Sequence, residues 1–292
     1  MPNPTGRYLN NESLLKVDEG KSSQTSLANK DFDERSQMLN WNDMSQLQRR
    51  ISETSVGVQR REAVLKELSP ELGQFILEIG CGGGQLLKEV GMRVGPSGKV
   101  IGLDSSADQI AAAKSFCKEV DHIEFFNGKL EELEGSDNQL DSVTSTQTLE
   151  YVEDLDSLMK SMVKLMKPWS KFINYSTLWD YFRFHGPEEK LNQLIHTAAI
   201  HQAHLMLPSK LLGILKKYGF HNVRTNPVPF FFTKRDANSF ANFTEMNLAK
   251  VALQNGVADA TVTEWRRQLK EAEQEGRFSF TVIGVVTTGY RT

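Results

Sequence analysis

Apolar and polar positions follow two alternating periods between residues 75 and 175. Short, largely apolar runs bounded by glycine, proline or acidic residues predict buried β-strands. The predicted strands are Phe75–Ile79, Lys99–Leu103, His122–Phe126, Leu140–Ser145 and Lys171–Tyr175. Between them, apolar residues recur at helical spacing, most clearly at Leu155, Leu158, Met159, Met162, Val163 and Met166. This alternation predicts an α/β fold with a doubly wound, mostly parallel sheet.

The alternation breaks at Ser176, and the rest of the chain has a different pattern. Residues 176–206 are rich in aromatic residues and histidines, and residues 236–275 show helical periodicity. We expect both segments to be lid insertions. Phe220–Phe232 and Arg277–Thr288 are predicted strands that close the sheet as an antiparallel pair. The expected fold is Rossmann-like, with a seven-stranded mostly parallel sheet and helical cap and lid insertions.

The segment before the sheet divides into two parts. Residues 1–34 are polar and lack apolar periodicity, which is typical of a mobile N-terminal arm. Residues 35–70 become helical and are expected to form an N-terminal cap, followed by the main domain at 71–292. Two arginine pairs of the cap are expected on a solvated helix face. They are Arg49-Arg50 and Arg60-Arg61.

Composition and charge argue against several classes of protein. The 292 residues include 34 Lys and Arg and 37 Asp and Glu, which gives a formal net charge of −3. A nucleic-acid partner favours a basic face, so this balance argues against nucleic acid, although it leaves a local basic patch open. The two cysteines, Cys81 and Cys117, are too few for a disulfide framework or a cysteine-rich metal site.

The sequence shows no segment that suggests a membrane. No apolar run approaches the ~18 residues of a transmembrane helix, and residues 1–15 contain no apolar leader. We therefore expect a cytoplasmic protein without membrane insertion. The sequence leaves its oligomeric state open.

One stretch, FILEIGCGGGQLL at residues 75–87, organises the predicted sheet. A buried strand runs into a glycine turn and a helix start, which is the arrangement that binds nucleotides in doubly wound sheets. Glycines allow a tight bend and let a ligand approach bare backbone N–H groups. A dinucleotide fingerprint needs a small residue at the position where this chain has Gln85, so the match to that fingerprint is incomplete.

Two acidic residues indicate which nucleotide the turn favours. Glu78, near the end of the first strand, would repel a pyrophosphate but suits a cationic ligand. Asp104 ends the second strand, twenty residues after Gly84, where an acidic side chain accepts both ribose hydroxyls. Together they indicate an adenosine that carries positive charge and no phosphates.

Several further motifs extend this pattern along the chain. They are LEIGCGGGQLL (77–87), VIGLDSSADQI (100–110), EFFNGKLEEL (124–133), LDSVTSTQTLEYVEDL (140–155), LMKPWSKF (165–172) and LPSKLLGILKKYGFHNV (207–223). With these motifs, the sequence resembles the class I S-adenosylmethionine-dependent methyltransferases. The resemblance is to the small-molecule branch that includes the ubiquinone and menaquinone methyltransferases, and it covers about residues 70–230.

The resemblance implies S-adenosylmethionine as the cofactor, and it implies which residues bind each part of the cofactor. The glycine turn would hold the methionine part, Asp104 the ribose, and the segment after the third strand the adenine. Residues after the fourth strand would line the side of the reacting methyl group. The implied cofactor-binding residues are Glu78, Gly80, Cys81, Gly82, Gly84, Asp104, Ser105, Gln109, Asn127, Gly128, Lys129, Leu130, Thr146 and Gln147.

Two positions depart from the family's pattern. Lys129 stands where the family often has an aspartate, so another group must accept the adenine amine. The usual Lys-Pro-Gly-Gly turn is Lys167-Pro168-Trp169-Ser170 here, and we expect Trp169 to pack against the protein rather than contact a substrate.

The chemistry of methyl transfer defines the candidate catalytic residues. Displacement at a sulfonium carbon is in line, and it needs an aligned, unprotonated acceptor. A general base is needed only for a hydroxyl or a protonated amine. The candidates are Tyr151 beside Glu150 and four histidines after the fifth strand, His185, His196, His201 and His204, and of these we select Tyr151, His185 and His201. No metal is expected, because suitably spaced carboxylates near the histidines are missing.

The acceptor is predicted from aromatic residues after the fifth strand. These are Trp179, Tyr181, Phe182, Phe184 and Phe230–Phe232. They favour a pocket for an apolar or aromatic metabolite, although they also suit a cationic amine. The predicted function is S-adenosylmethionine-dependent methyl transfer to a small molecule. Two alternatives stay open: methylation of RNA or protein, and a non-catalytic cofactor-binding module.

Overall fold

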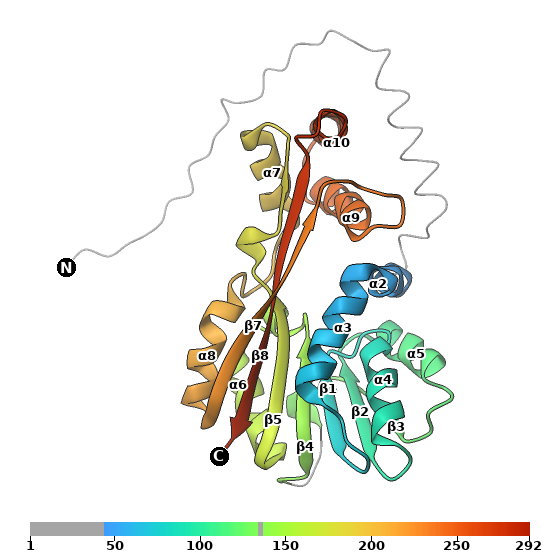
Figure 1. Cartoon of the computed structure of the whole chain (residues 1–292), viewed down its shortest axis with the longest axis vertical. Helices are drawn as coiled ribbons and strands as arrows, with labels where there is room; N and C mark the ends of the chain where they lie inside the picture. Colours follow the sequence, from blue (N-terminus) through green and yellow to red (C-terminus); the bar gives the residue numbers. More distant parts are fainter. Residues whose placement is uncertain (1–43, 134–136) are drawn as a thin grey trace, which may run out of the picture. The chain divides into compact units, whose positions relative to one another are not determined.

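Strands from both halves of the chain form one mixed sheet with helices on both faces (Figure 1). The computed structural model describes residues 44–133 and 137–292, which lie within one compact unit. Over these residues the sheet has eight strands in the order β3-β2-β1-β4-β5-β8-β6, and β7 also pairs with β8. Their bounds are β1 (Phe75–Ile79), β2 (Lys99–Asp104), β3 (Ile123–Asn127), β4 (Leu140–Thr146), β5 (Met166–Thr177), β6 (Arg183–His185), β7 (Phe220–Phe232) and β8 (Ser279–Arg291).

Helices connect these strands, and polar residues cap several of them. Ser106 accepts a hydrogen bond from the backbone of Gln109, and Asp154 accepts one from Ser157. The α-helices are α2 (Met44–Glu53), α3 (Ser55–Leu68), α4 (Gln85–Val94), α5 (Ala107–Phe116), α6 (Leu155–Leu165), α7 (Glu189–Ala199), α8 (Leu207–Lys217), α9 (Phe240–Gln254) and α10 (Asp259–Gln274). Single turns of 3₁₀ helix are η1 (Leu130–Glu132), η2 (Leu149–Tyr151) and η3 (Trp179–Tyr181).

The first five strands are all parallel, so their carboxyl ends meet at one edge of the sheet. The register places Glu78 of β1 between Gly102 of β2 and Thr144 of β4. Asp104 at the end of β2 pairs with Asn127 at the end of β3. In doubly wound sheets the ligand lies at this edge, where the strand order reverses. Here the reversal falls between β1 and β4.

Two hydrophobic clusters cover the two faces of the parallel part of the sheet. On one face, α3, α4 and α5 bury residues such as Val64, Leu87 and Ile110 against the strands. On the other face, α6 and α8 bury residues such as Met159 and Leu211. The predicted stripe of α6 therefore points into the core, and burial of this apolar surface is the main stabilising contribution.

Strand β8 extends beyond the parallel strands and builds a second core. Residues Gly284–Tyr290 pair with β5, whereas Ser279–Thr281 pair with β6, and β7 lies along the opposite edge. Helices α7, α9 and α10 surround this extension (Figure 1). We call η3, β6, α7, α9, α10 and the adjoining ends of β7 and β8 the C-terminal lobe. Its core is aromatic: Phe184 stacks on Phe280 with ring centroids 4.1 Å apart.

The α/β fold and its mostly parallel sheet are confirmed. The structure differs in detail, because β6 adds a short strand inside the segment expected to be a lid, and the sheet thus has eight strands over the described residues. The 236–275 segment forms two helices, α9 and α10, separated by residues 255–258. The predicted arm at 1–34 lies outside the described residues, and the domain bounds stay predictions. Among the described helices, none is long and apolar enough to cross a membrane.

Gly284 of β8 offers a test of how the sheet is packed. A Cβ atom there would overlap the hydroxyl of Tyr175, which is 1% exposed. We expect Gly284→Ala to lower the free energy of unfolding by about 1–3 kcal/mol, because the buried ring has no room to move. Gly213 of α8 is the control, because its Cβ would meet no atom within 4 Å. Gly213→Ala should stabilise by about 0.5–1 kcal/mol. Urea unfolding measures both, and equal effects would contradict the packing described.

Candidate active site at the carboxyl edge of the sheet

The glycine turn after β1 is held against the end of β2. The backbone N–H groups of Gly80 and Cys81 both donate to the Leu103 carbonyl, at 2.7 and 2.9 Å. Gly80 has a φ of +73°, and a Cβ atom on it would overlap the side chain of Thr148, which follows β4. Only glycine therefore fits at this position, because it avoids both the strain and the overlap.

Asp104 joins the turns that follow three neighbouring strands. Its Oδ2 accepts a hydrogen bond from the Gly82 N–H and its Oδ1 accepts one from the Ser106 N–H, both at 2.9 Å. Its backbone carbonyl accepts from Asn127 Nδ2 at 3.0 Å and from the Gly128 N–H at 3.1 Å. Each carboxylate oxygen has a second lone pair, so Asp104 can accept further hydrogen bonds from a ligand.

Glu78 is a buried carboxyl that no cationic side chain pairs with in the described part of the chain. It is 3% exposed, and Oε2 has no hydrogen-bond partner among the described residues. Burial, and next the neighbouring charge of Asp104, raise the pKa of Glu78 well above its usual value. An unpaired buried carboxyl is costly unless a cation or a donor joins it. This corner of the sheet therefore favours a cationic ligand.

Two glutamine side chains lie beside the glycine turn. A Cβ atom built on Gly82 would lie 3.4 Å from Oε1 of Gln48 in α2 and 3.8 Å from Oε1 of Gln109 in α5. The Gln109 oxygen is buried and has no hydrogen-bond partner among the described residues. The surroundings of Gly82 are therefore rich in acceptor oxygens, which again suits a ligand with N–H, O–H or cationic groups.

The segment after β4 faces this turn and carries a strained residue. Gln147 has a φ of +52°, which a non-glycine residue seldom adopts. Hydrogen bonds hold it there: its N–H donates to the Tyr175 carbonyl at 2.7 Å, and Nε2 donates to Thr177 Oγ1 at 3.0 Å. Its Oε1 accepts from Arg60 of α3. Strain of this kind is typical of functional sites.

Glu150, in η2, is fully buried. Its Oε2 accepts from the Ser176 hydroxyl at 3.0 Å and its Oε1 from the Thr177 N–H at 3.4 Å. Burial raises its pKa. Because β5 and η2 enclose it, Glu150 holds the two segments together.

The structure brings most of the sequence-predicted cofactor residues to this edge, with different surroundings. Gly84, with a φ of +85°, caps α4. Ser105 and Lys129 are exposed, and the Lys129 N–H donates to Glu132 at 3.0 Å. Leu130, by contrast, is 3% exposed and belongs to the hydrophobic core. Thr146 Oγ1 is buried without a hydrogen-bond partner in the described part of the chain.

The buried cysteines lie beneath the turn. Cys81 is 5% exposed, and burial raises the pKa of its thiol, so the thiol stays protonated at neutral pH. Cys117 donates to the Gly84 carbonyl at 3.5 Å, and burial raises its pKa to about 11. Both fill space rather than offer a thiolate. Within residues 44–133 and 137–292, no group of three or more His, Cys, Asp or Glu residues is placed to hold a metal ion.

The three catalytic candidates are not brought together. Tyr151 is exposed, and its hydroxyl accepts from Gln202 Nε2 at 3.2 Å. His185 is exposed in β6 and pairs with Ser279, within the C-terminal lobe. His201 is exposed after α7, within 3.0 Å of Asn255 Nδ2. A role for any of them as a base stays a prediction, and only Tyr151 comes from the segment after β4.

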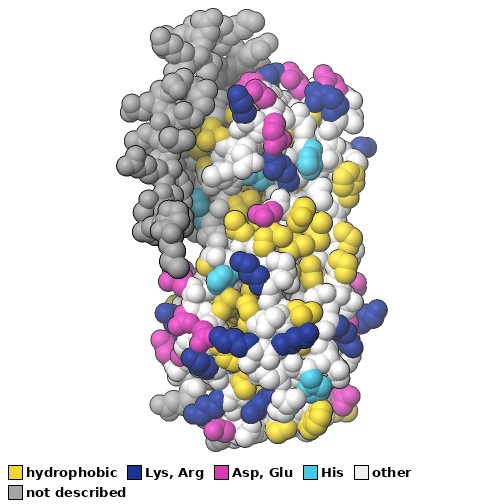
Figure 2. Space-filling model, turned by 90° about the vertical axis from the view of Figure 1, so that its left-hand side faces the viewer, with side chains coloured by type: hydrophobic (Ala, Val, Ile, Leu, Met, Phe, Trp, Pro, Cys, Tyr) yellow, Lys and Arg dark blue, Asp and Glu magenta, His cyan; other side chains and the backbone are white. Residues whose placement is uncertain are grey.

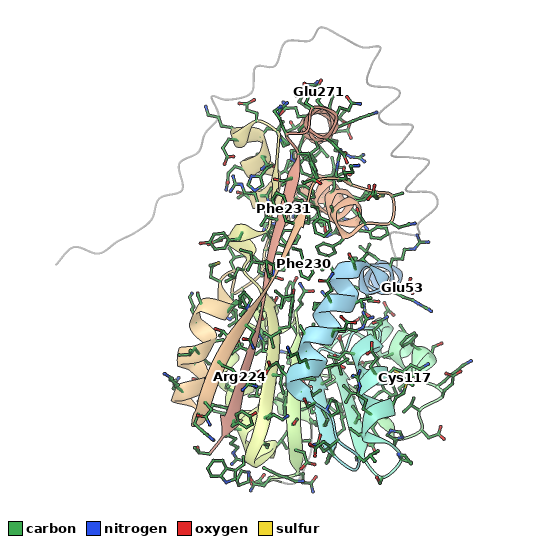
Figure 3. All side chains as sticks on the ribbon, viewed as in Figure 1. Glu53, Cys117, Arg224, Phe230, Phe231 and Glu271 are labelled. Carbon is green, nitrogen blue, oxygen red and sulfur yellow. The ribbon has the colours of Figure 1, made fainter. Side chains whose placement is uncertain are left out.

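The aromatic residues expected around an acceptor form two groups. Phe182 and Phe184 lie in the core of the C-terminal lobe, together with Phe230, which is 7% exposed. Phe231, the next residue of β7, points to the other side and is 68% exposed (Figure 3). Hydrophobic side chains are exposed together at mid-height of the molecule on the face shown in Figure 2. Because Phe182, Phe184 and Phe230 are buried, these predicted pocket residues stabilise the lobe.

Sequence reasoning missed Arg60. The expectation that Arg60 and Arg61 lie on a solvated face is wrong, because Arg60 turns toward Gln147 and Arg61 pairs with Glu89 at 2.9 Å. No local sequence pattern distinguishes an arginine whose side chain reaches the edge of a sheet from an arginine that is exposed to solvent. Trp169, expected to pack against the protein, makes an edge contact with His221, with ring centroids 5.0 Å apart, but the residue is 71% exposed.

With this geometry in place, comparison with known proteins identifies the class of domain. Residues 76–169 match the family model of a methyltransferase domain. The predicted resemblance to the S-adenosylmethionine-dependent methyltransferases is thereby confirmed for the segment that carries the glycine turn and Asp104.

Curated relatives include demethylmenaquinone methyltransferases. The one from Oceanobacillus iheyensis is 29% identical over 119 residues, which are 40% of this chain and 50% of the relative. The one from Lactobacillus johnsonii is 34% identical over 125 residues, with the same two shares covered. The chain spans about half the length of the curated relatives it matches.

Solved structures share the fold. The YcgJ protein from Bacillus subtilis is 16% identical, with a TM-score of 0.56 over 80% of this chain and 98% of that one. Phosphoethanolamine N-methyltransferase 2 from Haemonchus contortus, solved with S-adenosyl-L-methionine, is 20% identical. Its TM-score is 0.53 over 82% of this chain and 53% of that one. At these identities the likeness is one of fold.

The raised pKa of Glu78 gives a testable dependence of stability on pH. A carboxyl that holds its proton more tightly when folded loses stability as the pH rises from its unfolded pKa, about 4.3, through its folded pKa. Glu78→Gln removes this loss. At about pH 8 we expect the ligand-free Glu78→Gln variant to have a larger free energy of unfolding than the natural chain. This difference should vanish near pH 4.

Urea unfolding of the ligand-free chain across this pH range measures the effect. Exposed Glu153 is the control, and Glu153→Gln should leave the profile unchanged. A Glu78→Gln variant that is less stable than the natural chain at the higher pH would contradict the description of this carboxyl.

Proposed function

We propose that this protein transfers a methyl group from S-adenosylmethionine to a small-molecule acceptor by in-line displacement. The observation that carries the proposal is the pair of acidic residues on adjacent strands, Glu78 and Asp104, that flank a glycine turn. Two carboxyls at this corner disfavour a phosphate and favour a cationic adenosine. The methyltransferase-domain match over the same segment supports this proposal.

The residues at the edge fit the cofactor. Glu78 Oε2 and Gln109 Oε1 are buried acceptors without a partner in the described chain, so a donor or cation would satisfy them. Asp104 keeps free lone pairs for the ribose hydroxyls, and Gly82 leaves room for close approach. When bound, S-adenosylmethionine would supply an electrophilic methyl group on a sulfonium.

The chain's own contribution is positioning and exclusion of water. Gln147, locked by its bonds to Tyr175 and Thr177, fixes the wall of the site on the side of β4. Helix α3 covers this wall through Arg60, and residues 200–205 cover η2, because the His204 N–H donates to the Glu150 carbonyl at 3.0 Å. Positioning of this kind lowers the barrier without a covalent intermediate.

The positions of α3 and residues 200–205 support a small acceptor, one that is apolar or aromatic. A long polymer needs an open, charged groove, whereas α3 and the 200–205 segment both contact the segment after β4, and the net charge is −3. The names of the relatives give demethylmenaquinone, a small molecule, as the compound that those proteins methylate.

The experiment is incubation of the full chain with methyl-labelled S-adenosylmethionine and a cell extract that contains metabolites, RNA and protein, followed by separation of these fractions and mass analysis. Small products that gain one labelled methyl group support the proposal. Label that appears only in RNA or protein would establish the macromolecular alternative instead. Tight cofactor binding with no labelled product in any fraction would favour a non-catalytic module.

Asp104 gives a sharper prediction for the cofactor. Asp104→Ala should weaken S-adenosylmethionine binding about tenfold or more, because hydrogen bonds to a charged group are lost and the Gly82 turn loses its acceptor. Isothermal titration measures this. Asp121, exposed and distant in sequence from the turn, is the control, and Asp121→Ala should bind normally. Unchanged affinity of Asp104→Ala would rule out its ribose role.

A further inference from the structure

A strained tryptophan lies at the amino edge of the sheet, the edge opposite the candidate site. Trp169 belongs to a bulge of β5, residues 167–170, and it has a φ of +66° and is 71% exposed. A positive φ is rare for a bulky residue, whereas glycine adopts it without strain. No Phe, Trp or Tyr in the described part of the chain is more exposed. A contact with another molecule would offset both the strain and the exposure of the indole.

The bulge that carries Trp169 is held in a fixed shape. Lys167 Nζ donates to Asp141 Oδ1, and Ser170 Oγ donates to the Lys167 carbonyl, both at 2.6 Å. The indole meets the His221 ring edge-on, with ring centroids 5.0 Å apart. An aromatic side chain that is already fixed loses little conformational entropy on binding, and tryptophan is enriched among the residues that dominate interfaces.

A groove between α3 and α4 opens at the same edge and has room for an indole. Its volume is about 460 Å³, and it is formed where the two helices end, just before β1 and β2. Leu65 and Pro70 give its lining apolar surface. Lys66 and Arg93, also in the lining, carry cations that can lie on the face of an aromatic ring. We call this feature the α3–α4 groove.

Trp169 and the α3–α4 groove lie on two sides of the C-terminal end of α3. Lys171, two residues beyond Trp169, donates through Nζ to the Leu68 carbonyl at 2.8 Å, so the start of β5 lies against this end of the helix. The groove lies on the side toward α4, and Figure 1 shows α3 between β5 and α4. A two-fold axis beside the end of α3 would bring each Trp169 to the groove of a second copy. A surface of this kind is self-complementary, as a symmetric dimer requires.

We propose that two copies of this chain associate through their amino edges, with Trp169 of each copy in the α3–α4 groove of the other. The charges are complementary. Arg291, at the end of β8, donates to the neutral Asn138 at 2.6 Å, whereas Glu62 and Glu71 bring two carboxylates to the groove. The carboxyl edges, which carry the candidate sites, face away from this contact.

The size of a stable interface indicates a further contact residue. Such an interface buries about 1,200 Å² or more, which two indoles alone do not supply. Leu72 follows Glu71 of the groove and is 77% exposed. We therefore expect Leu72 to be buried in the dimer together with Trp169.

Sedimentation velocity of the full chain at about 1–100 μM tests the proposed dimer. We expect a species of twice the chain's mass. Trp169→Gly should weaken the association at least about tenfold, because the central aromatic contact is lost. Glycine suits the positive φ, so at the lowest concentration this variant should melt no lower than the natural chain. Phe231→Ser is the matched control, because Phe231 is 68% exposed at the other end of β7, and it should leave the dimer unchanged.

A second variant tests the groove. Lys66→Trp fills the groove from the exposed face of α3, so it should weaken the dimer as Trp169→Gly does. A mixture of the two variants keeps one natural contact, in which Trp169 of the Lys66→Trp copy enters the open groove of the Trp169→Gly copy. The mixture should therefore associate more tightly than either variant alone.

Four results would overturn the inference. They are a natural chain that is monomeric over the whole range, a dimer that Trp169→Gly leaves unchanged, a mixture no tighter than its components, and assembly into open chains longer than two, which a head-to-tail contact would give. None of these measurements depends on methyl transfer, so the result is independent of the proposed function.

Discussion

The candidate site depends on one carboxylate. The Asp104 side chain accepts hydrogen bonds from the Gly82 and Ser106 N–H groups. Its backbone carbonyl accepts hydrogen bonds from Asn127 Nδ2 and the Gly128 N–H. Three turns that belong to separate strand–helix units are thereby fixed relative to one another. Hydrogen bonds to a charged acceptor are stronger than neutral ones, which explains how short glycine-rich turns keep a defined shape. The ligand edge is thus preorganised by the protein, which reduces the entropy lost on binding.

This preorganisation is balanced by unfavourable burial of charge. Glu78 is withdrawn from water and Arg60 is half-buried, both without ion partners in the described chain, and Gln147 adopts a strained backbone. A chain selected for stability alone would favour apolar residues at such positions. These features gather along the edge where β1, β2 and β4 end, while both faces of the sheet carry ordinary hydrophobic cores. The concentration of buried polar groups without partners is what makes this edge the candidate site.

Helix α3 and strand β8 connect the site to the rest of the protein. Helix α3 packs Val64 and Leu68 against the sheet and Val56 against the C-terminal lobe, with Arg60 between the two contacts. Strand β8 likewise pairs with β5 in the sheet and with β6 in the lobe. Because α3 and β8 contribute to both the sheet and the C-terminal lobe, they fix the position of Arg60 relative to the carboxyl edge of the sheet. The aromatic residues of the lobe, such as Phe184 on Phe280, serve this rigid support.

The sequence by itself determined the parallel strands, the glycine turn and the acidic residues that follow β1 and β2, because hydrophobic periodicity and turn chemistry are local properties. It also indicated the class of domain, since the motifs lie at fixed positions along that alternation. Only the tertiary structure decided which side chains from distant segments meet. Arg60 reaches Gln147 across 87 positions of sequence, and Phe184 lies in a lobe core rather than a pocket. The hydrophobic pattern gives each residue a face of its own element, whereas the packing of elements decides what that face meets.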